Sequence, residues 1–281
     1  PANHLDLGVS YSNIAGAYRD LGQFEKALEF HQKAIKILQY ALETNHPYLA
    51  LTYDSTAGTY RQLGQYLKAL EYFQKALKIR LTVFEANHPE LATSYNNIAV
   101  TYTDLGQYQK ALEYNQKALE TRQAVLAANH PDLATSYNNI AVTYNNLGQY
   151  QKALEYHQKA LDTRQAVLAA NHPDLATTYN NIATTYRKLG RYEKALEYNQ
   201  KALEILQSIL PANHPDLATF YNNIGGTYRE LKQYEKALKN YQKALEIRTE
   251  VLSTNHPDLA TSYNNIAIAY TYLGQYEVAL K

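Results

Sequence analysis

Paired asparagines recur along the chain and could bind a ligand through hydrogen bonds. A side-chain amide offers both donors and an acceptor, so a column of amides can pair with the N–H and C=O groups of an extended peptide. One such bond contributes only about 0.5–1.5 kcal/mol net, so several are needed for useful affinity. The pairs repeat every 42 residues and comprise Asn96, Asn97, Asn138, Asn139, Asn180, Asn181, Asn222, Asn223, Asn264 and Asn265.

Arginines accompany some of these pairs. They stand seven residues after the first pair position, at Arg19, Arg61, Arg187 and Arg229. A guanidinium binds a carboxylate through two parallel hydrogen bonds. The pattern therefore predicts two basic patches, one early and one late in the chain, and an acidic peptide as ligand. The alternative is that these are solvated arginines, which the helix dipole favours at a helix end.

Histidines repeat with the same period and raise the possibility of a metal site. The triplet Asn-His-Pro begins at Asn45, Asn87, Asn129, Asn171, Asn213 and Asn255. Zinc ligands must all lie about 2 Å from one ion, whereas packed helices stand about 8–10 Å apart. Neighbouring copies cannot share an ion on that spacing. We therefore expect no metal or other cofactor, and we interpret His-Pro as the start of a helix.

No catalytic constellation is present in the sequence. It contains neither a phosphate-binding glycine loop nor a Gly-x-Ser-x-Gly motif. Cysteine is absent, which excludes disulfides and a thiolate nucleophile within this chain. The net charge is +1, so no strong field favours nucleic acid or an anionic membrane. We predict a cytoplasmic protein that is not an enzyme and that binds neither nucleic acid nor membrane.

The elements that must position these residues follow from the period. A fixed repeat of 20–50 residues is typical of a solenoid. We predict one repeat domain over residues 1–281 with about 6.7 copies, bounded at 1–44, 45–86, 87–128, 129–170, 171–212, 213–254 and 255–281.

Each repeat is predicted to be two antiparallel helices. In the fourth copy, His130-Pro131 indicates a helix start because proline suits the first turn. This helix should end before Gly148, since a glycine tolerates the positive φ of a C-terminal cap. A second helix should run from Tyr150 to about Ala169. The apolar stripes comprise Tyr137, Ile140, Ala141, Tyr144 and Leu147 on the first helix, and Tyr150, Ala153, Leu154, Ala160 and Leu161 on the second.

The spacing Tyr137, Ile140, Ala141, Tyr144, Gly148, Tyr150, Ala153 and Ala160 resembles the tetratricopeptide repeat. The 42-residue length, together with His-Pro-Asp and Asn-Asn-Ile-Ala, is similar to kinesin light chain arrays and to bacterial multi-repeat proteins. Gln165 stands where the family has a closing proline, and we expect the second helix to continue about two turns beyond it. One position late in the second helix departs from the family's large apolar residue and carries His31, Phe73, Asn115, His157, Asn199 and Tyr241.

The resemblance implies an all-α, right-handed superhelix whose first helices line a concave groove. It also implies that the asparagines and arginines face a bound peptide there. Another interpretation of the asparagines is that one member of each pair bonds a neighbouring helix and holds the stack together.

Three functions compete. The first is a scaffold that binds extended, acidic protein segments. The second is a structural scaffold that associates end to end, because repeats three to five are nearly identical and the ends lack polar capping helices. The third is the sensor or regulatory arm of a larger multidomain protein.

Overall fold

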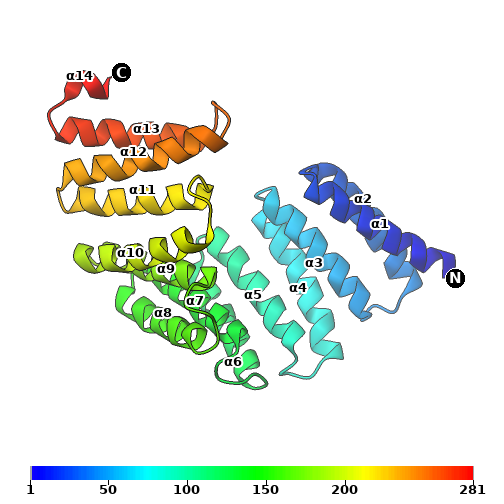
Figure 1. Cartoon of the computed structure of the whole chain (residues 1–281). Helices are drawn as coiled ribbons and strands as arrows, with labels where there is room; N and C mark the ends of the chain where they lie inside the picture. The colour runs from blue at the N-terminus through cyan, green and yellow to red at the C-terminus, as the bar shows by residue number, and fades with distance from the viewer. Residues whose placement is uncertain (1, 281) are drawn as a thin grey trace. The chain divides into compact units, whose positions relative to one another are not determined.

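The structure is a computed structural model that describes residues 2–280 (Figure 1). That part consists of fourteen α-helices and contains no strand, as the all-α prediction requires. The chain divides into two compact units, residues 1–128 and 129–281, at a predicted repeat boundary. None of the described helices is long and apolar enough to cross a membrane.

Both units are built from antiparallel helix pairs. Unit 1 contains α1 (Ala2–Asp20), α2 (Phe24–Ala41), α3 (Pro47–Gln62), α4 (Tyr66–Val83), α5 (Pro89–Asp104) and α6 (Tyr108–Gln123). Unit 2 contains α7 (Pro131–Asn146), α8 (Tyr150–Gln165), α9 (Pro173–Lys188), α10 (Tyr192–Ile209), α11 (Pro215–Glu230), α12 (Tyr234–Val251), α13 (Pro257–Tyr272) and α14 (Tyr276–Ala279). Within a unit, each second helix also packs against the first helix of the next repeat.

Histidine caps the first helices, as the His-Pro motif predicts. The Nδ1 atom of His130 accepts a hydrogen bond from the backbone N–H of Asp132 at 3.2 Å, and Pro131 occupies the first turn. The same bond forms at His46, His88, His172, His214 and His256. At the other end of α7, Gly148 has φ +72°, the left-handed conformation expected of it.

The second helix is shorter than predicted. We expected it to reach Ala169, well beyond Gln165, but α8 ends at Gln165. The backbone N–H of His172 bonds the carbonyl of Ala169 at 2.9 Å and closes a turn. This turn brings His172 to its capping position, and Ala169 is its first residue, so the helix ends before it.

Alanines allow the helices to approach closely. Two positions of every complete second helix carry alanine, and none of these alanines is more than 2% exposed. In α8 they are Ala153 and Ala160, both predicted to lie in the apolar stripe. The predicted first-helix residues Ile140 and Ala141 are also fully buried.

The variable position of the second helix belongs to the core, whatever its chemistry. Its six residues are 0–5% exposed, and they are His31, Phe73, Asn115, His157, Asn199 and Tyr241. The largest of them requires space from its partner helix. A Cβ atom on Gly225 would lie 2.7 Å from Cε1 of Tyr241, whereas the equivalent residue beside His157 is Ala141. The glycine at 225 is thus the complement of the tyrosine.

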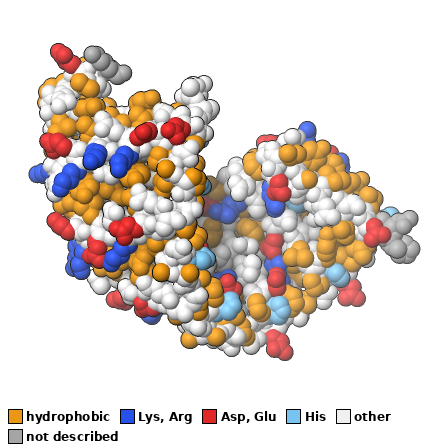
Figure 2. All heavy atoms as spheres, in the orientation of Figure 1, with side chains coloured by type: hydrophobic (Ala, Val, Ile, Leu, Met, Phe, Trp, Pro, Cys, Tyr) orange, Lys and Arg blue, Asp and Glu red, His pale blue; other side chains and the backbone are white. Residues whose placement is uncertain are grey.

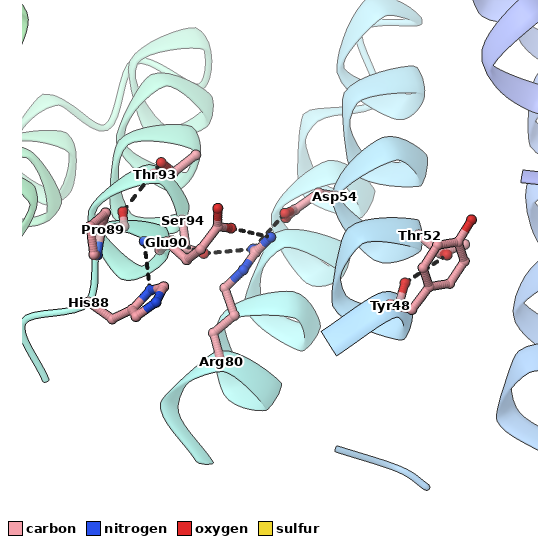
Figure 3. A network of polar contacts seen from close by, with 9 residues as sticks. All are labelled: Tyr48, Thr52, Asp54, Arg80, His88, Pro89, Glu90, Thr93 and Ser94. Atoms are coloured by element: carbon pink, nitrogen blue, oxygen red, sulfur yellow. Dashed lines mark hydrogen bonds and ion pairs between the residues drawn. The ribbon is translucent and has the colours of Figure 1, made fainter. Parts of the chain in front are cut away.

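Buried arginines join successive repeats, and the sequence analysis did not identify them. Arg80 of α4 is 3% exposed and reaches Asp54 of α3 at 2.5 Å, and Ser94 and Glu90 of α5 at 2.8 and 3.2 Å (Figure 3). In unit 2, Arg164 donates to Thr178, and Arg248 donates to Ser262. Each of these last two bonds links a second helix to the first helix of the next repeat, whereas Asp54 lies in the same repeat as Arg80.

One junction replaces both partners of this polar bond with apolar residues. Leu206 stands at the arginine position of α10, and Phe220 stands at the serine or threonine position of α11. Both side chains are buried in the same cluster, at 6% and 9% exposure. The two unusual residues therefore compensate for each other.

Exchanging this pair tests the compensation. We expect Leu206→Arg alone to lower the free energy of unfolding by roughly 3 kcal/mol, because a buried guanidinium then faces a phenyl ring. Phe220→Ser alone should cost a similar amount through the cavity it leaves. The double variant recreates the Arg248–Ser262 junction and should recover more than half of the summed loss. Urea unfolding of the parent, the two single variants and the double variant gives the coupling energy between the two positions. If the losses of the single variants simply add in the double variant, the two residues do not compensate for each other.

Two buried histidines make stability depend on pH. His31 and His157 are fully buried, and burial is the main cause that lowers the pKa of each to about 4, with a smaller effect of Arg19 and Arg164 respectively. The unfolded chain binds the proton near pH 6.5. Stability should therefore be complete above pH 6.5 and should fall as the pH approaches 4, by roughly 2 kcal/mol per histidine at pH 5.

The matched variant is His157→Asn, because Asn115 and Asn199 occupy the same position in other repeats. Urea midpoints at pH 7 and pH 5 should differ less for this variant than for the parent. An equal difference in the two proteins would show that His157 does not titrate on unfolding.

Candidate peptide-binding surface

The paired asparagines lie on the first helices, outside the apolar stripe. In α7, Asn138 and Asn139 are half-buried, whereas the neighbouring Ile140 is fully buried. We call the outward surface of α1, α3 and α5 the first-helix face of unit 1, and that of α7, α9, α11 and α13 the first-helix face of unit 2. The asparagine and arginine positions of most repeats belong to this face, whereas Asp54 and Asn145 at these positions bond neighbouring helices.

Asparagines of successive repeats are hydrogen-bonded to each other in unit 2. The side-chain amide of Asn181 donates to Oδ1 of Asn138 at 2.9 Å. Asn223 donates to Asn180 at 2.9 Å, and Asn265 donates to Asn222 at 2.8 Å. The second residue of one pair is always the donor and the first residue of the preceding pair is the acceptor. We call each such bond a rung.

The rungs give the asparagines a stacking role and still leave capacity for a ligand. An amide has two N–H donors and an oxygen with two acceptor positions, so one rung cannot use up either side chain. The rungs also hold the amides in a regular row along the first-helix face of unit 2. Both interpretations of the asparagines, stacking and ligand binding, are compatible with this geometry.

Unit 1 breaks the row at its second repeat. Asp54 stands at the first asparagine position, and Ser55 at the second. Asp54 is committed to Arg80. Burial is the largest influence and raises the pKa of the Asp54 carboxyl, although Arg80 opposes the shift. This position therefore holds the arginine that also bonds Ser94 and Glu90 of the next repeat.

The arginines that follow the asparagine pairs have different ion-pair partners in the two units. In unit 1, Arg19 pairs with Asp20 at 3.3 Å, and Arg61 pairs with Asp104 at 2.5 Å. The basic patch predicted for the early repeats is thus accompanied by equal negative charge. On the face that Figure 2 presents, basic and acidic side chains are likewise interspersed.

The C-terminal ends of α9 and α11 in unit 2 carry more positive charge than the equivalent helix ends of unit 1. Arg229 pairs with Glu230 at 3.0 Å. Arg187 and Lys188 at the end of α9 form no ion pair among the described residues. Three cations thus accompany one carboxylate at these two helix ends, whereas the exposed Asp174 and Asp216 lie in the first turns of the same helices.

At the fourth repeat the arginine position turns inward. Asn145 is 7% exposed, and its amide donates to Oγ1 of Thr185 at 2.7 Å and lies 3.5 Å from Nε2 of His157. This residue therefore links α7 to α9 and does not contribute to a binding surface.

The tyrosines pack against each other within the repeats. Tyr144 and Tyr156 have ring centroids 5.6 Å apart, and lysines lie over both rings. Equivalent pairs recur in the other repeats, which fits their predicted packing role. The capping histidines accept from the backbone through Nδ1, and the described residues contain no group of three or more potential ligands able to hold a metal ion.

The comparison with known families identifies the chain. A tetratricopeptide repeat model matches residues 6–82, 57–124, 90–145, 132–208 and 216–281. The chain belongs to the tetratricopeptide repeat family. Tetratricopeptide repeats generally mediate interactions between proteins, and the chain is an interaction scaffold in that general sense. A search of the curated proteins found no match.

Solved structures share the fold. A kinesin light chain-like protein of Podosopora anserina with nearly identical repeats is 24% identical, covers 73% of this chain and 96% of its own, and has a TM-score of 0.66. BtubC from P. vanneervenii is 24% identical over 78% of this chain and 85% of its own, with a TM-score of 0.62. Aspartyl phosphate phosphatase F from Bacillus subtilis is 21% identical, covers 97% of this chain and 68% of its own, and has a TM-score of 0.70.

The stacking contribution of a rung can be measured directly. We expect Asn181→Ala to be less stable than Asn264→Ala by about 0.5–1.5 kcal/mol in the free energy of unfolding, because both variants gain the same helix propensity and only Asn181→Ala loses the donor to Asn138. Asn264→Ala is the matched control, since Asn264 is exposed and takes part in no rung among the described residues. Thermal unfolding should separate the two variants, and equal midpoints would show that the rung adds nothing to the stack.

Proposed function

We propose that the chain binds an extended, acidic segment of another protein along the first-helix face of unit 2. The row of hydrogen-bonded asparagines carries this proposal. Three rungs hold six amides in a regular row, and amides match the alternating N–H and C=O groups of an extended backbone. Such recognition is independent of the ligand's side chains, so it needs a second feature to select among segments.

Charge supplies that selection. At the C-terminal ends of α9 and α11, Arg187, Lys188 and Arg229 are accompanied by one carboxylate, Glu230. At the equivalent helix ends of unit 1, Arg19 and Arg61 are matched by Asp20 and Asp104. Carboxylates of a ligand would therefore be attracted more strongly to the ends of α9 and α11 than to the ends of α1 and α3. A cytoplasmic location belongs to the same proposal.

A peptide-binding experiment with charge-matched variants tests this. The probe is a library of extended nine-residue peptides, screened at low and at physiological salt. Acidic peptides should be enriched, and their affinity should fall as salt rises, because the contacts are exposed. Arg187→Thr with Lys188→Asn should weaken binding roughly tenfold, about 1.4 kcal/mol. These substitutions are modest, because Thr103 and Asn146 stand at the same positions elsewhere.

The control double variant is Arg61→Thr with Asp104→Asn. It installs the same two residue types but removes a neutral ion pair. Binding of the acidic peptides should remain within about twofold of the parent. Equal losses in the two double variants, or enrichment that ignores charge, would contradict the proposal.

A second role is compatible with the same surface. The tetratricopeptide repeat sensor of a Signal Transduction ATPase with Numerous Domains from Pyrococcus horikoshii has the same fold, with 22% identity, a TM-score of 0.73 and coverage of 97% of this chain and 42% of that one. If this chain is likewise the arm of a larger protein, peptide binding on unit 2 would be its input.

A further inference from the structure

A small pocket beside the loop that joins two repeats occurs at the same place in both units. In unit 1 it is lined by that loop, α3 and α4, and in unit 2 by the corresponding loop, α11 and α12. The two pockets have volumes of about 280 and 260 Å³. None of their lining residues belongs to the asparagine pairs or to the arginines that follow them. The pockets are therefore distinct from the proposed peptide-binding surface.

Four lining positions are identical in the two pockets. They supply an amide, a phenol, an ammonium and an aliphatic side chain: Asn45, Tyr53, Lys75 and Ile79 in unit 1, and Asn213, Tyr221, Lys243 and Ile247 in unit 2. The side-chain amide of Gln39 donates to Oη of Tyr53 at 2.9 Å, and Gln207 donates to Tyr221 at 2.9 Å. A phenol that accepts a hydrogen bond keeps its own hydrogen to donate. Both pockets thus share a set of hydrogen-bond donors.

Three lining positions differ, and the differences concern charge and hydrogen bonding. Unit 1 carries Thr44, Lys78 and Thr82, whereas unit 2 carries Ala212, Glu246 and Glu250. The third and fourth repeats combine an acidic residue with two alanines, namely Ala86, Glu120 and Ala124, and Ala128, Asp162 and Ala166. The unit 1 pocket therefore has a cation and hydroxyls where the equivalent positions have carboxylates and methyl groups. Together the changes favour an anion in unit 1.

Both charged residues that line the unit 1 pocket are cations. Lys78 forms no ion pair among the described residues. Lys75 pairs with Glu71 at 2.6 Å and keeps further N–H groups for a second partner. The carboxylates within four residues of the lining positions are not part of the lining, and they are Glu43, Asp54, Glu71 and Glu85. Thr82 donates its hydroxyl to the carbonyl of Ile79 at 2.7 Å, so its main contribution is that it stands where unit 2 has an acidic residue.

We propose that the unit 1 pocket binds a dianionic phosphate group, free or carried as a monoester, and that the unit 2 pocket does not. A phosphomonoester has a charge of about −1.5 to −2 at pH 7 and three strong acceptor oxygens, whereas a carboxylate has a single charge and two oxygens. Five side chains able to donate line the pocket and match the phosphate better, and they are Thr44, Asn45, Tyr53, Lys75 and Lys78. The volume lies just below the roughly 300–1,000 Å³ of most small-molecule sites, which suits so small a group.

The unit 2 pocket repels the same group. There Glu246 and Glu250 place two carboxylates beside the single ammonium of Lys243, and like charges at short range are unfavourable. The phosphate site goes beyond the proposed function, because its residues and its ligand are different. The two proposals therefore stand or fall separately.

The test uses NMR titrations of the whole chain at about pH 7.5, where a second pKa near 6 leaves phosphate mostly dianionic. The backbone amides of Thr44 and Asn45 report on unit 1, and those of Ala212 and Asn213 report on unit 2. The probes are inorganic phosphate, N-acetyl-O-phosphoserinamide and the uncharged N-acetylserinamide, all at one ionic strength. The phosphate probes should give saturable shifts in unit 1 at millimolar concentration and none in unit 2, and the uncharged probe should give none in either. A several-fold higher affinity for the ester would identify a phosphorylated molecule as the ligand, and equal affinities would identify free phosphate.

A charge reversal in the pocket has a matched control. Lys78→Glu should weaken phosphate binding by about tenfold or more, because it replaces the ammonium with the carboxylate that other repeats carry at this position. Lys36→Glu makes the same change at the same position one repeat earlier, where the side chain does not line the pocket. This control changes the net charge equally and should leave Kd within about twofold of the parent, because charges outside the pocket are screened.

A transplant provides the reciprocal test. Ala212→Thr, Glu246→Lys and Glu250→Thr together give the unit 2 pocket the same seven residue types that line the unit 1 pocket. The triple variant should show new saturable shifts at Asn213. If the parent shows no saturable shift at Thr44 and Asn45, or if Lys78→Glu leaves the affinity unchanged, the site is overturned. A triple variant that stays silent at Asn213 would overturn the assignment of phosphate binding to these three positions.

Discussion

Close approach of helices at alanines is the constraint on which the structure depends. Every complete second helix carries alanine at two buried positions, so the distance between helices is set by backbone contact. A larger residue elsewhere in the interface cannot push the helices apart and must be matched locally. Gly225 gives space to Tyr241, and Phe220 replaces a hydroxyl where Leu206 replaces a guanidinium. The repeats thus vary in compensated pairs.

The same constraint separates packing from recognition. Because the alanines and the apolar stripe fix the stack, residues on the first-helix face can change without loss of the fold. Arg187 and Thr103 occupy the same position, as do Gly16 and Val142. The differences between the units therefore lie in charge and in surface shape. Balanced charges at the first-helix ends of unit 1 and an excess of cations at the ends of α9 and α11 are built on one template.

The sequence predicts the parts of this structure that follow from local rules. The period, the His-Pro caps, the glycine with positive φ and the apolar stripes were correct, because each depends on a few neighbouring residues. The buried arginines were missed, because Arg164 lies near the end of a helix, where a cation is normally solvated. Only the next repeat reveals that Thr178 receives it. The predicted end of the second helix was also wrong, because helix propensity carries no information about the turn that places His172 at its capping position. The peptide-binding roles of the asparagines and arginines remain a prediction.

The energy of a rung bears on why asparagines are present at all. Two asparagines in helix interiors cost up to about 1.4 kcal/mol in helix propensity relative to alanine, and one hydrogen bond contributes about 0.5–1.5 kcal/mol net. A rung such as Asn181 to Asn138 therefore adds little to the stability of the stack. What it does change is the freedom of the two amides, which are ordered before any ligand arrives. Ordering a side chain on binding costs about 0.5–1.5 kcal/mol, so amides already ordered by rungs bind a peptide backbone at a lower cost. The rungs contribute more to such binding than to the fold.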